Sequence, residues 1–190
     1  MPVASITLLA GYGPETEARL VRRVALATRS VIAAPASGTT VFVKHAATYM
    51  RDGRVFTGGG PALPEAADVV RAFLQSMQAR ELDAARTHLA AGFEMVFPGG
   101  ARMTRLEQLL EWASGRYRSI AKTCERFDEC WQDGVTVVFC SGPLQGTWPG
   151  GQAFQGIRFV DRFELVDGRI RRQEVWNDLV EAKPRAGHPG

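Results

Sequence analysis

The sequence is poor in cysteine and histidine, and it has no long apolar run. Among its 190 residues are three histidines and three cysteines, Cys124, Cys130 and Cys140. An odd number of cysteines without a CxxC pair predicts neither a disulfide framework nor a zinc site, so we expect reduced thiols in a cytoplasmic protein. No apolar run approaches the roughly 20 residues of a membrane span, and no secretory signal is visible. We therefore expect no membrane association.

Phosphate-binding and metal-binding motifs are also missing. The chain has no Walker loop, no dinucleotide fingerprint and no His-rich metal spacing. We therefore expect no cofactor and no metal. The net charge is +3, and the basic residues, nearly all arginine, are scattered instead of clustered. Nucleic-acid binding requires a basic stripe or patch, so no nucleic-acid partner is predicted. The preference for arginine, with abundant alanine and glycine, suggests a GC-rich bacterial genome.

The sequence divides at a segment rich in glycine and proline. Apolar residues make up 45% and charged residues 23% of the chain, as is usual for a globular protein. The stretch "TGGGPALPEA", residues 57–66, holds three glycines and two prolines. Such clusters interrupt regular structure and mark linkers. We therefore predict two domains, residues 1–60 and 61–190.

The first domain has the pattern of a strand, a helix and a second strand. "PVASITLLA" is strand-like, Pro14 suits the first turn of a helix, and "TTVFVKHA" is β-branched and apolar. Glu15 and Glu17 complement the dipole at the start of that helix. So small a unit buries little surface alone. It is therefore expected to pack against copies of itself, giving a homo-oligomer, or against the second domain.

The second domain begins with helices and ends with strands. Apolar residues recur at helical spacing after residue 65, and "TRLEQLLEWASGRY" predicts another helix. "TCERFDECW", "VTVVFC", "FQGIRFVDRFELV" and "RIRRQEVWNDLV" then predict four strands joined by hairpin turns at Asp133-Gly134, Pro149-Gly150-Gly151 and Asp167-Gly168. The predicted fold class is α+β. Helices wrapped around a curved antiparallel sheet would enclose a pocket.

Residues 2 to about 60 resemble the small 4-oxalocrotonate tautomerase family. The resemblance rests on Pro2 behind Met1, the β-α-β layout, "AP" at residues 34 and 35, and the ending "FTGGG". It implies that Met1 is removed and that the secondary amine of Pro2 is a general base. A free α-amino group titrates at about 7.7–8.0, and burial lowers that value toward neutrality.

The first domain departs from that family at two positions. Tyr12 and Thr40 stand where typical members carry the arginines that bind carboxylates. A dicarboxylate substrate is therefore not expected. The candidate substrate contacts are Tyr12, Thr40, Lys44 and Phe56, of which Lys44 could supply a positive charge. The alternative is that these side chains are ordinary packing or surface residues.

Residues 65 to about 182 resemble the nuclear transport factor two-like superfamily, in its SnoaL-like and ketosteroid isomerase-like branch. The matching segments are "VVRAFLQSMQARELDAARTHLA", "FEMVFPGG" and "FVDRFELVDGRIRRQEVWNDLVEA". The resemblance implies a cone-shaped domain and places Asp161 at the isomerase acid that stays protonated and donates a hydrogen bond. Period-two spacing puts Asp161 on the same strand face as Phe159, Phe163 and Leu165. The alternative is an ion pair with an arginine such as Arg158 or Arg171.

The second domain lacks two residues of that isomerase. Phe73 and Phe97 stand where the resemblance would place its catalytic tyrosine and aspartate, so steroid isomerisation is not expected. The predicted pocket is largely apolar, although each member could equally be a core residue; its lining residues are Phe73, Phe97, Trp112, Trp131 and Trp176. Asp178 resembles an acidic position of SnoaL-like cyclases, or it is a solvated strand end.

These observations predict an enzyme for cofactor-independent proton transfer on a small carbonyl or polyketide-like compound. It would act as a tautomerase, isomerase or cyclase, with Pro2, Asp161 or both as catalytic groups. One alternative is a non-catalytic protein that binds an apolar ligand while the tautomerase-like half only oligomerises. A third hypothesis divides the roles, so that the first half assembles the complex and the second half is the enzyme.

Overall fold

The chain forms two compact units. A computed structural model describes residues 1–183, and its contacts divide the chain into unit 1, Met1–Leu63, and unit 2, Pro64–Gly190. That these units correspond to separately folding domains stays a prediction. Within residues 1–183, no helix has both the length and the apolar character needed to cross a membrane.

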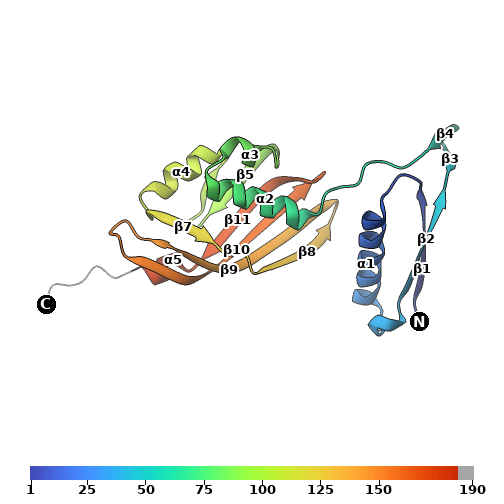
Figure 1. The fold of residues 1–190 in the computed structure, drawn as a ribbon, viewed down its shortest axis with the longest axis horizontal. Helices are drawn as coiled ribbons and strands as arrows, with labels where there is room; N and C mark the ends of the chain where they lie inside the picture. Colours follow the sequence, from blue (N-terminus) through green and yellow to red (C-terminus); the bar gives the residue numbers. More distant parts are fainter. Residues whose placement is uncertain (184–190) are drawn as a thin grey trace. The chain divides into compact units, whose positions relative to one another are not determined.

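Unit 1 is a β-α-β unit followed by a hairpin (Figure 1). Its elements are β1 (Val3–Leu9), α1 (Pro14–Val31), the short 3-10 helix η1 (Ala36–Gly38), β2 (Thr40–Ala46), β3 (Thr48–Arg51) and β4 (Arg54–Thr57). β1 and β2 pair in parallel. Helix α1 begins at Pro14, whose fixed φ suits the first helical turn, and Glu15 and Glu17 lie there as expected. The β-α-β layout agrees with the sequence, while the resemblance of unit 1 to the tautomerases stays a prediction.

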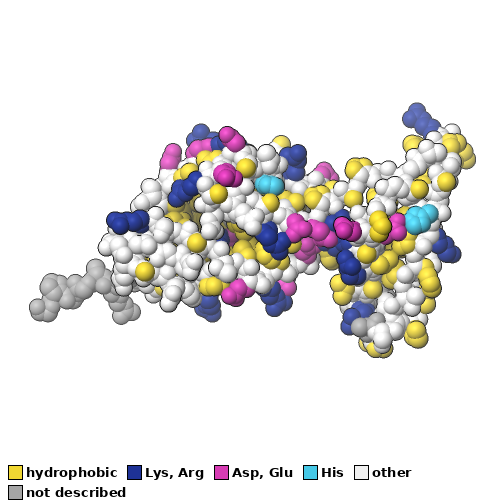
Figure 2. Space-filling model, viewed as in Figure 1, with side chains coloured by type: hydrophobic (Ala, Val, Ile, Leu, Met, Phe, Trp, Pro, Cys, Tyr) yellow, Lys and Arg dark blue, Asp and Glu magenta, His cyan; other side chains and the backbone are white. Residues whose placement is uncertain are grey.

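Unit 1 has almost no apolar core of its own. Helix α1 has no buried residue, and the buried apolar side chains of the described chain all belong to unit 2. Figure 2 shows hydrophobic side chains spread over the surface of unit 1. Val3, Phe42, Met50 and Val55 are each more than half exposed. Burial of apolar surface is the main stabilising contribution in folding. Because unit 1 buries little apolar surface within a single chain, it gains little stability from this source.

Unit 2 combines a curved sheet with helices. Its elements are α2 (Ala66–Ala79), α3 (Leu82–Arg86), β5 (Leu89–Phe97), β6 (Ala101–Met103), α4 (Leu106–Ser114), β7 (Ser119–Lys122), β8 (Arg126–Gln132), β9 (Val135–Thr147), β10 (Ala153–Val166), β11 (Arg169–Asn177) and α5 (Leu179–Ala182). Helices α2, α3 and α4 lie on one side of the sheet (Figure 1). This arrangement is the α+β fold with a curved sheet that the sequence predicted.

The sheet has the order β6-β5-β11-β10-β9-β7, and β8 also pairs with β9. Consecutive strands from β8 to β11 are antiparallel, as the hairpin signals predicted. Asp167 and Gly168 both have positive φ at the β10–β11 turn, the conformation that Asp-Gly favours in tight hairpins. β5 instead pairs in parallel with β11. This corrects the expectation of a purely antiparallel sheet, because β5 reaches the sheet from the helices and not through a hairpin.

One edge of β9 holds two partners in succession. Val135–Ser141 pairs with β8, and Leu144–Thr147 pairs with β7. Between these two regions lies Gly142, where a Cβ atom would meet the carbonyl oxygen of Thr123 at 2.0 Å. Only glycine allows the β7–β8 connection to approach the strand this closely. Gly142 therefore lets residues 123–125 lie directly against β9.

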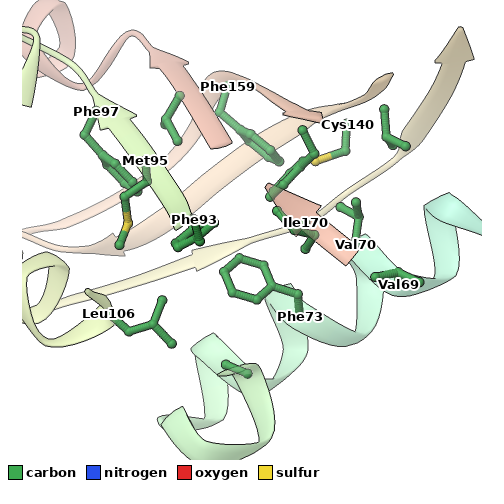
Figure 3. Packing of buried hydrophobic residues seen from close by; sticks show 14 of the residues in the cluster. Val69, Val70, Phe73, Phe93, Met95, Phe97, Leu106, Cys140, Phe159 and Ile170 are labelled. Carbon is green, nitrogen blue, oxygen red and sulfur yellow. The ribbon is translucent and has the colours of Figure 1, made fainter. Parts of the chain in front are cut away.

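The core of unit 2 lies between α2 and the inner face of the sheet. Figure 3 shows Phe73 on α2 pointing toward Phe93 on β5 and Ile170 on β11. The Phe73 ring makes edge contacts with Phe93 and Phe163, at centroid distances of 6.3 and 6.1 Å. Phe159, Phe163 and Leu165 are buried on alternate positions of β10. Asp161 lies among them and is also fully buried, as period-two spacing predicted.

Candidate functional site

Unit 2 contains a large cavity beside this core. Its volume is about 950 Å³, and its wall is formed by residues of α2, α4, α5 and the sheet. That volume suits a small organic ligand. The wall has a prominent aromatic component, made by Phe73, Phe97, Trp112, Tyr117 and Trp148.

A buried ion pair connects the cavity wall to the sheet. Lys122, at the end of β7, lines the cavity, and its Nζ donates a hydrogen bond to Oδ2 of Asp161. The ammonium also lies 4.9 Å from the centroid of the Phe159 ring. Removing a carboxylate from water is costly unless it is paired, and Lys122 supplies that pairing. Asp161 is thus an acceptor in this site, and the group that faces the cavity is the ammonium.

Gln173 is the second polar contact of Asp161. Its Nε2 donates to Asp161 Oδ2 at 3.1 Å, and Gln173 is itself buried while contributing to the cavity wall. Among residues 1–183, neither Gln173 Oε1 nor Asp161 Oδ1 has a hydrogen-bond partner. Buried polar atoms are nearly always paired, so an unpaired acceptor in a cavity wall indicates a place where a ligand or water donates.

Two thiols lie next to the ion pair. Cys124 lines the cavity, and Cys140 is buried directly opposite Asp161 in the β9–β10 ladder. A hydrogen bond with Cys140 lowers the pKa of Cys124, and the nearby charge of Lys122 lowers it further, whereas burial and the charge of Asp161 oppose this. The same hydrogen bond, with burial and the charge of Asp161, raises the pKa of Cys140. Cys124 is therefore the thiol of the pair that ionises first.

The predicted pocket residues fall into two groups. Phe73, Phe97 and Trp112 line the cavity, whereas Trp131 and Trp176 do not and are about half exposed. Trp176 is exposed because side chains alternate between the two faces of β11, and its neighbour Val175 is the one buried on the inner face. Trp131 lies near the β8–β9 turn, at the end of its strand.

Asp178 is also not among the residues that line the cavity. Its Oδ2 accepts a hydrogen bond from Arg158 Nε at 2.7 Å, and the Arg158 side chain is largely exposed. Arg171 in turn bonds to Glu164. The arginines considered as partners of Asp161 therefore bind other acids, and the ion pair of Asp161 is with a lysine instead.

The predicted residues of unit 1 are distributed along its small sheet. The carbonyl of Pro2 accepts a hydrogen bond from the Thr40 amide at 3.1 Å, so these two residues are neighbours where β1 and β2 begin. Tyr12 follows the opposite end of β1, and its ring packs against Gly59. Lys44 is exposed, and Phe56 stacks on Tyr49 with a centroid distance of 5.2 Å. The catalytic and binding roles suggested for these residues stay predictions.

The sequence interpretation did not include Lys122, Gln173 or Cys124. One signal was present, since lysine is rare in a chain whose cations are nearly all arginine, and Lys122 occurs within the apolar stretch "SIAKTC". Within the described residues, no group of three or more His, Cys, Asp or Glu side chains is arranged to hold a metal ion.

Unit 2 is thus an α+β fold in which a curved sheet and helices form the wall of a large cavity. Residues 70–173, more than half of the chain, match the family described as the SnoaL-like domain. The chain belongs to this family. No curated protein matches the chain.

Solved structures with the same fold are distant in sequence. The crystal structure of TerC co-crystallised with polyporic acid is 18% identical, covers 62% of this chain and 94% of its own, and has a TM-score of 0.51. A putative SnoaL-like polyketide cyclase from Jannaschia sp. CCS1 is also 18% identical, with 70% and 100% coverage and a TM-score of 0.50. An NTF2-like protein from Burkholderia thailandensis E264 is 12% identical, with 64% and 100% coverage and a TM-score of 0.53. At these identities the likeness concerns the fold.

Proposed function

We propose that the chain is an enzyme that moves a proton on a carbonyl compound held in the unit 2 cavity, as an isomerase or a polyketide-type cyclase. The observation that carries the proposal is the Lys122 ammonium, which lies in the cavity wall and is paired with Asp161. Membership of the SnoaL-like family and the likeness to a putative polyketide cyclase support this class of reaction. The polyporic acid complex of TerC supports a small organic ligand.

Lys122 is suited to stabilise an enolate. Removing a proton from the carbon beside a carbonyl moves the electron pair onto the carbonyl oxygen, which becomes negative. An ammonium has three N–H donors, and Asp161 accepts one of them. A preorganised donor that points at developing charge in a water-poor site is among the largest catalytic effects. In this proposal Asp161 and Gln173 are positioning residues that hold the ammonium in place.

Cys124 is the candidate base. It lines the same cavity two residues after Lys122, and its pKa is lowered by the hydrogen bond with Cys140. A thiolate at this position would accept the proton from carbon and return it to a second carbon or to the oxygen, so the reaction needs no external reactant. The aromatic wall would hold the substrate and exclude water.

A second candidate function is ligand binding without turnover. The observation that favours it is that, within the described part of the chain, no Asp, Glu or His side chain lines the cavity. Carboxylates and imidazoles are the usual bases for this chemistry. In this alternative, unit 1 with its exposed apolar side chains joins copies of the chain into a homo-oligomer. Light scattering on the full chain measures the assembly state.

Turnover distinguishes the two functions. Ketonisation of the enol of phenylpyruvate can be followed by absorbance with the full chain, with Asp161→Asn and with the double variant Lys122→Met/Asp161→Asn. Asp161→Asn keeps the ammonium, and the double variant removes it without leaving an unpaired charge. We expect the double variant to be at least about 100-fold slower than Asp161→Asn, the usual cost of losing one oxyanion donor. Equal rates in the two variants would contradict the role of Lys122.

A further inference from the structure

The charged side chains that are described in the cavity wall are all positive. Among residues 1–183, five positive side chains and no acidic side chain line the cavity; the five are Arg71, Arg80, Arg116, Lys122 and Lys183. Arg71 and Lys122 are paired with Asp68 and Asp161, respectively. Within the described residues, no ion pair neutralises Arg80 or Arg116. The part of the chain that the structure describes therefore supplies no counter-charge for these two guanidinium groups of the cavity wall.

Arg80 and Arg116 act on the same part of the cavity. Arg80, Arg116 and Tyr117 all line it. Burial raises the pKa of the Tyr117 phenol, and the charges of Arg116 and Arg80 both lower it. The Arg116 guanidinium also lies 3.9 Å from the centroid of the Trp112 ring, in a cation–π contact. Arg80 ends α2 with a φ of 63°, a left-handed position that favours glycine. The chain thus brings cations from the ends of two helices to one aromatic wall.

A neutral ligand fits this wall poorly. Arg80 and Arg116 line the cavity and are exposed to solvent. An apolar ligand that covered them would remove part of their hydration without supplying a counter-charge, which is unfavourable. A carboxylate or an acidic enolate would instead accept charge-assisted hydrogen bonds from the guanidinium groups. Such bonds strengthen when the bound ligand excludes water from the guanidinium groups, because the effective dielectric constant then falls.

Gln173 adds a second requirement. Its Oε1 atom is an acceptor without a partner among residues 1–183, and the residue is only 2% exposed while contributing to the cavity wall. Burying an unsatisfied acceptor costs free energy, which a ligand donor would recover. A hydroxyl or enol O–H is such a donor.

We infer that the cavity selects an anionic aromatic ligand that also has a hydroxyl or enol donor, with Arg80 and Arg116 binding its acidic group and Gln173 Oε1 accepting from its O–H. The ring system lies against Trp112 and the other aromatic residues of the wall. This inference deepens the proposed function, on which it rests, by naming the substrate class of the same cavity. Compounds that carry the acid as an ester are expected to bind more weakly than the free acids.

Three matched probes test the inference by calorimetry with the full chain. They are a naphthoic acid with a hydroxyl on the far ring, its methyl ester, and the naphthoic acid without the hydroxyl. We expect the hydroxy acid to bind with a Kd at least about tenfold lower than that of the ester. Its affinity should fall as salt is raised, whereas that of the ester should not. The acid without the hydroxyl should bind about fivefold more weakly than the hydroxy acid.

Variants test whether Arg80 and Arg116 cause the preference for the acid. Arg80→Gln/Arg116→Gln should abolish the preference for the acid over the ester, with a higher Kd for the acid than in the wild-type chain. The control Arg102→Gln removes an exposed arginine outside the cavity wall and should change nothing. The salt dependence of the wild-type chain tests the charge effect even if the double variant does not fold.

Three results would overturn the inference. They are equal binding of acid and ester, a Kd of the hydroxy acid above about 1 mM, or an unchanged preference in the folded double variant. Equal binding of the two acids would remove the role of Gln173. Preference for the acid without proton transfer would leave this inference in place and reject the proposed function. Turnover of carbonyl compounds without a preference for acids would support the proposed function and reject this inference.

Discussion

Lys122 and Asp161 are 39 residues apart in the sequence and form an ion pair in the wall of the cavity, where the carboxylate is fully buried. Losing one partner of a buried pair leaves an uncompensated charge, and the cost is about 3–5 kcal/mol. Because Lys122 is partly exposed, we expect Lys122→Met to lower the free energy of unfolding of unit 2 by about 3 kcal/mol, the low end of that range.

Adding Asp161→Asn to Lys122→Met should recover most of this loss, because no charge then remains unpaired. Urea unfolding followed by tryptophan fluorescence measures both variants, and all four tryptophans lie in unit 2. A Lys122→Met chain as stable as wild type would show that the pair contributes nothing to the fold.

Gly142→Ala should destabilise unit 2 by about 1–3 kcal/mol, the usual cost of overpacking. The added Cβ would lie 2.0 Å from the backbone oxygen of Thr123, and a backbone atom cannot move away as a flexible side chain does. The matched control is Gly150→Ala, because a Cβ there meets nothing within 4 Å. The same urea experiment compares them, and equal stability of the two variants would contradict the close approach of residues 123–125 to β9.

Cys124 should react with iodoacetamide at a lower pH than an unperturbed thiol does. The thiolate is the reactive form, and a lowered pKa makes it abundant at lower pH. Peptide mass spectrometry across a pH series gives the midpoint for Cys124, with a small free thiol as the reference. Cys140→Ala removes the hydrogen bond that is the main cause, so it should move the midpoint to higher pH. A midpoint above that of the free thiol would exclude Cys124 as the base.

Removal of Met1 decides whether Pro2 can act as a base. Pro2 is half-buried where β1 begins, and with Met1 attached its nitrogen is an amide without basic character. We expect the mature chain to begin at Pro2, and the intact mass of the purified protein measures this directly. A retained methionine would end the catalytic hypothesis for Pro2, while the cavity of unit 2 would be unaffected.

The sequence was sufficient for the parts of the fold that local patterns determine. The Asp-Gly turns and the alternation of β10 predicted the hairpins and the inward direction of Asp161, because a strand has a period of two residues. The helix that begins at Pro14 followed from this proline and from the acidic residues of the first turn. These features depend on neighbours in the chain, so a single sequence contains them.

The partners of Asp161 could not be predicted in the same way. Lys122 ends a strand of four residues, too short for a clear alternation, and it reaches Asp161 only because β7 pairs with the far half of β9. Trp176 was expected in the cavity because it is aromatic, yet the alternation of β11 turns it to the outer face, across from Val160. Long-range register decides both cases, and composition does not encode it.

The most direct test of the account is uptake of solvent deuterium next to the carbonyl of an aryl keto acid, followed by proton NMR in deuterated buffer. The samples are the wild-type chain, Pro2→Ala, Asp161→Asn and Lys122→Met/Asp161→Asn. We predict rapid exchange with wild type and Pro2→Ala, and a loss of at least about 100-fold between Asp161→Asn and the double variant. Exchange that disappears with Pro2→Ala and is unchanged by loss of the Lys122 ammonium would contradict the account and assign the chemistry to unit 1.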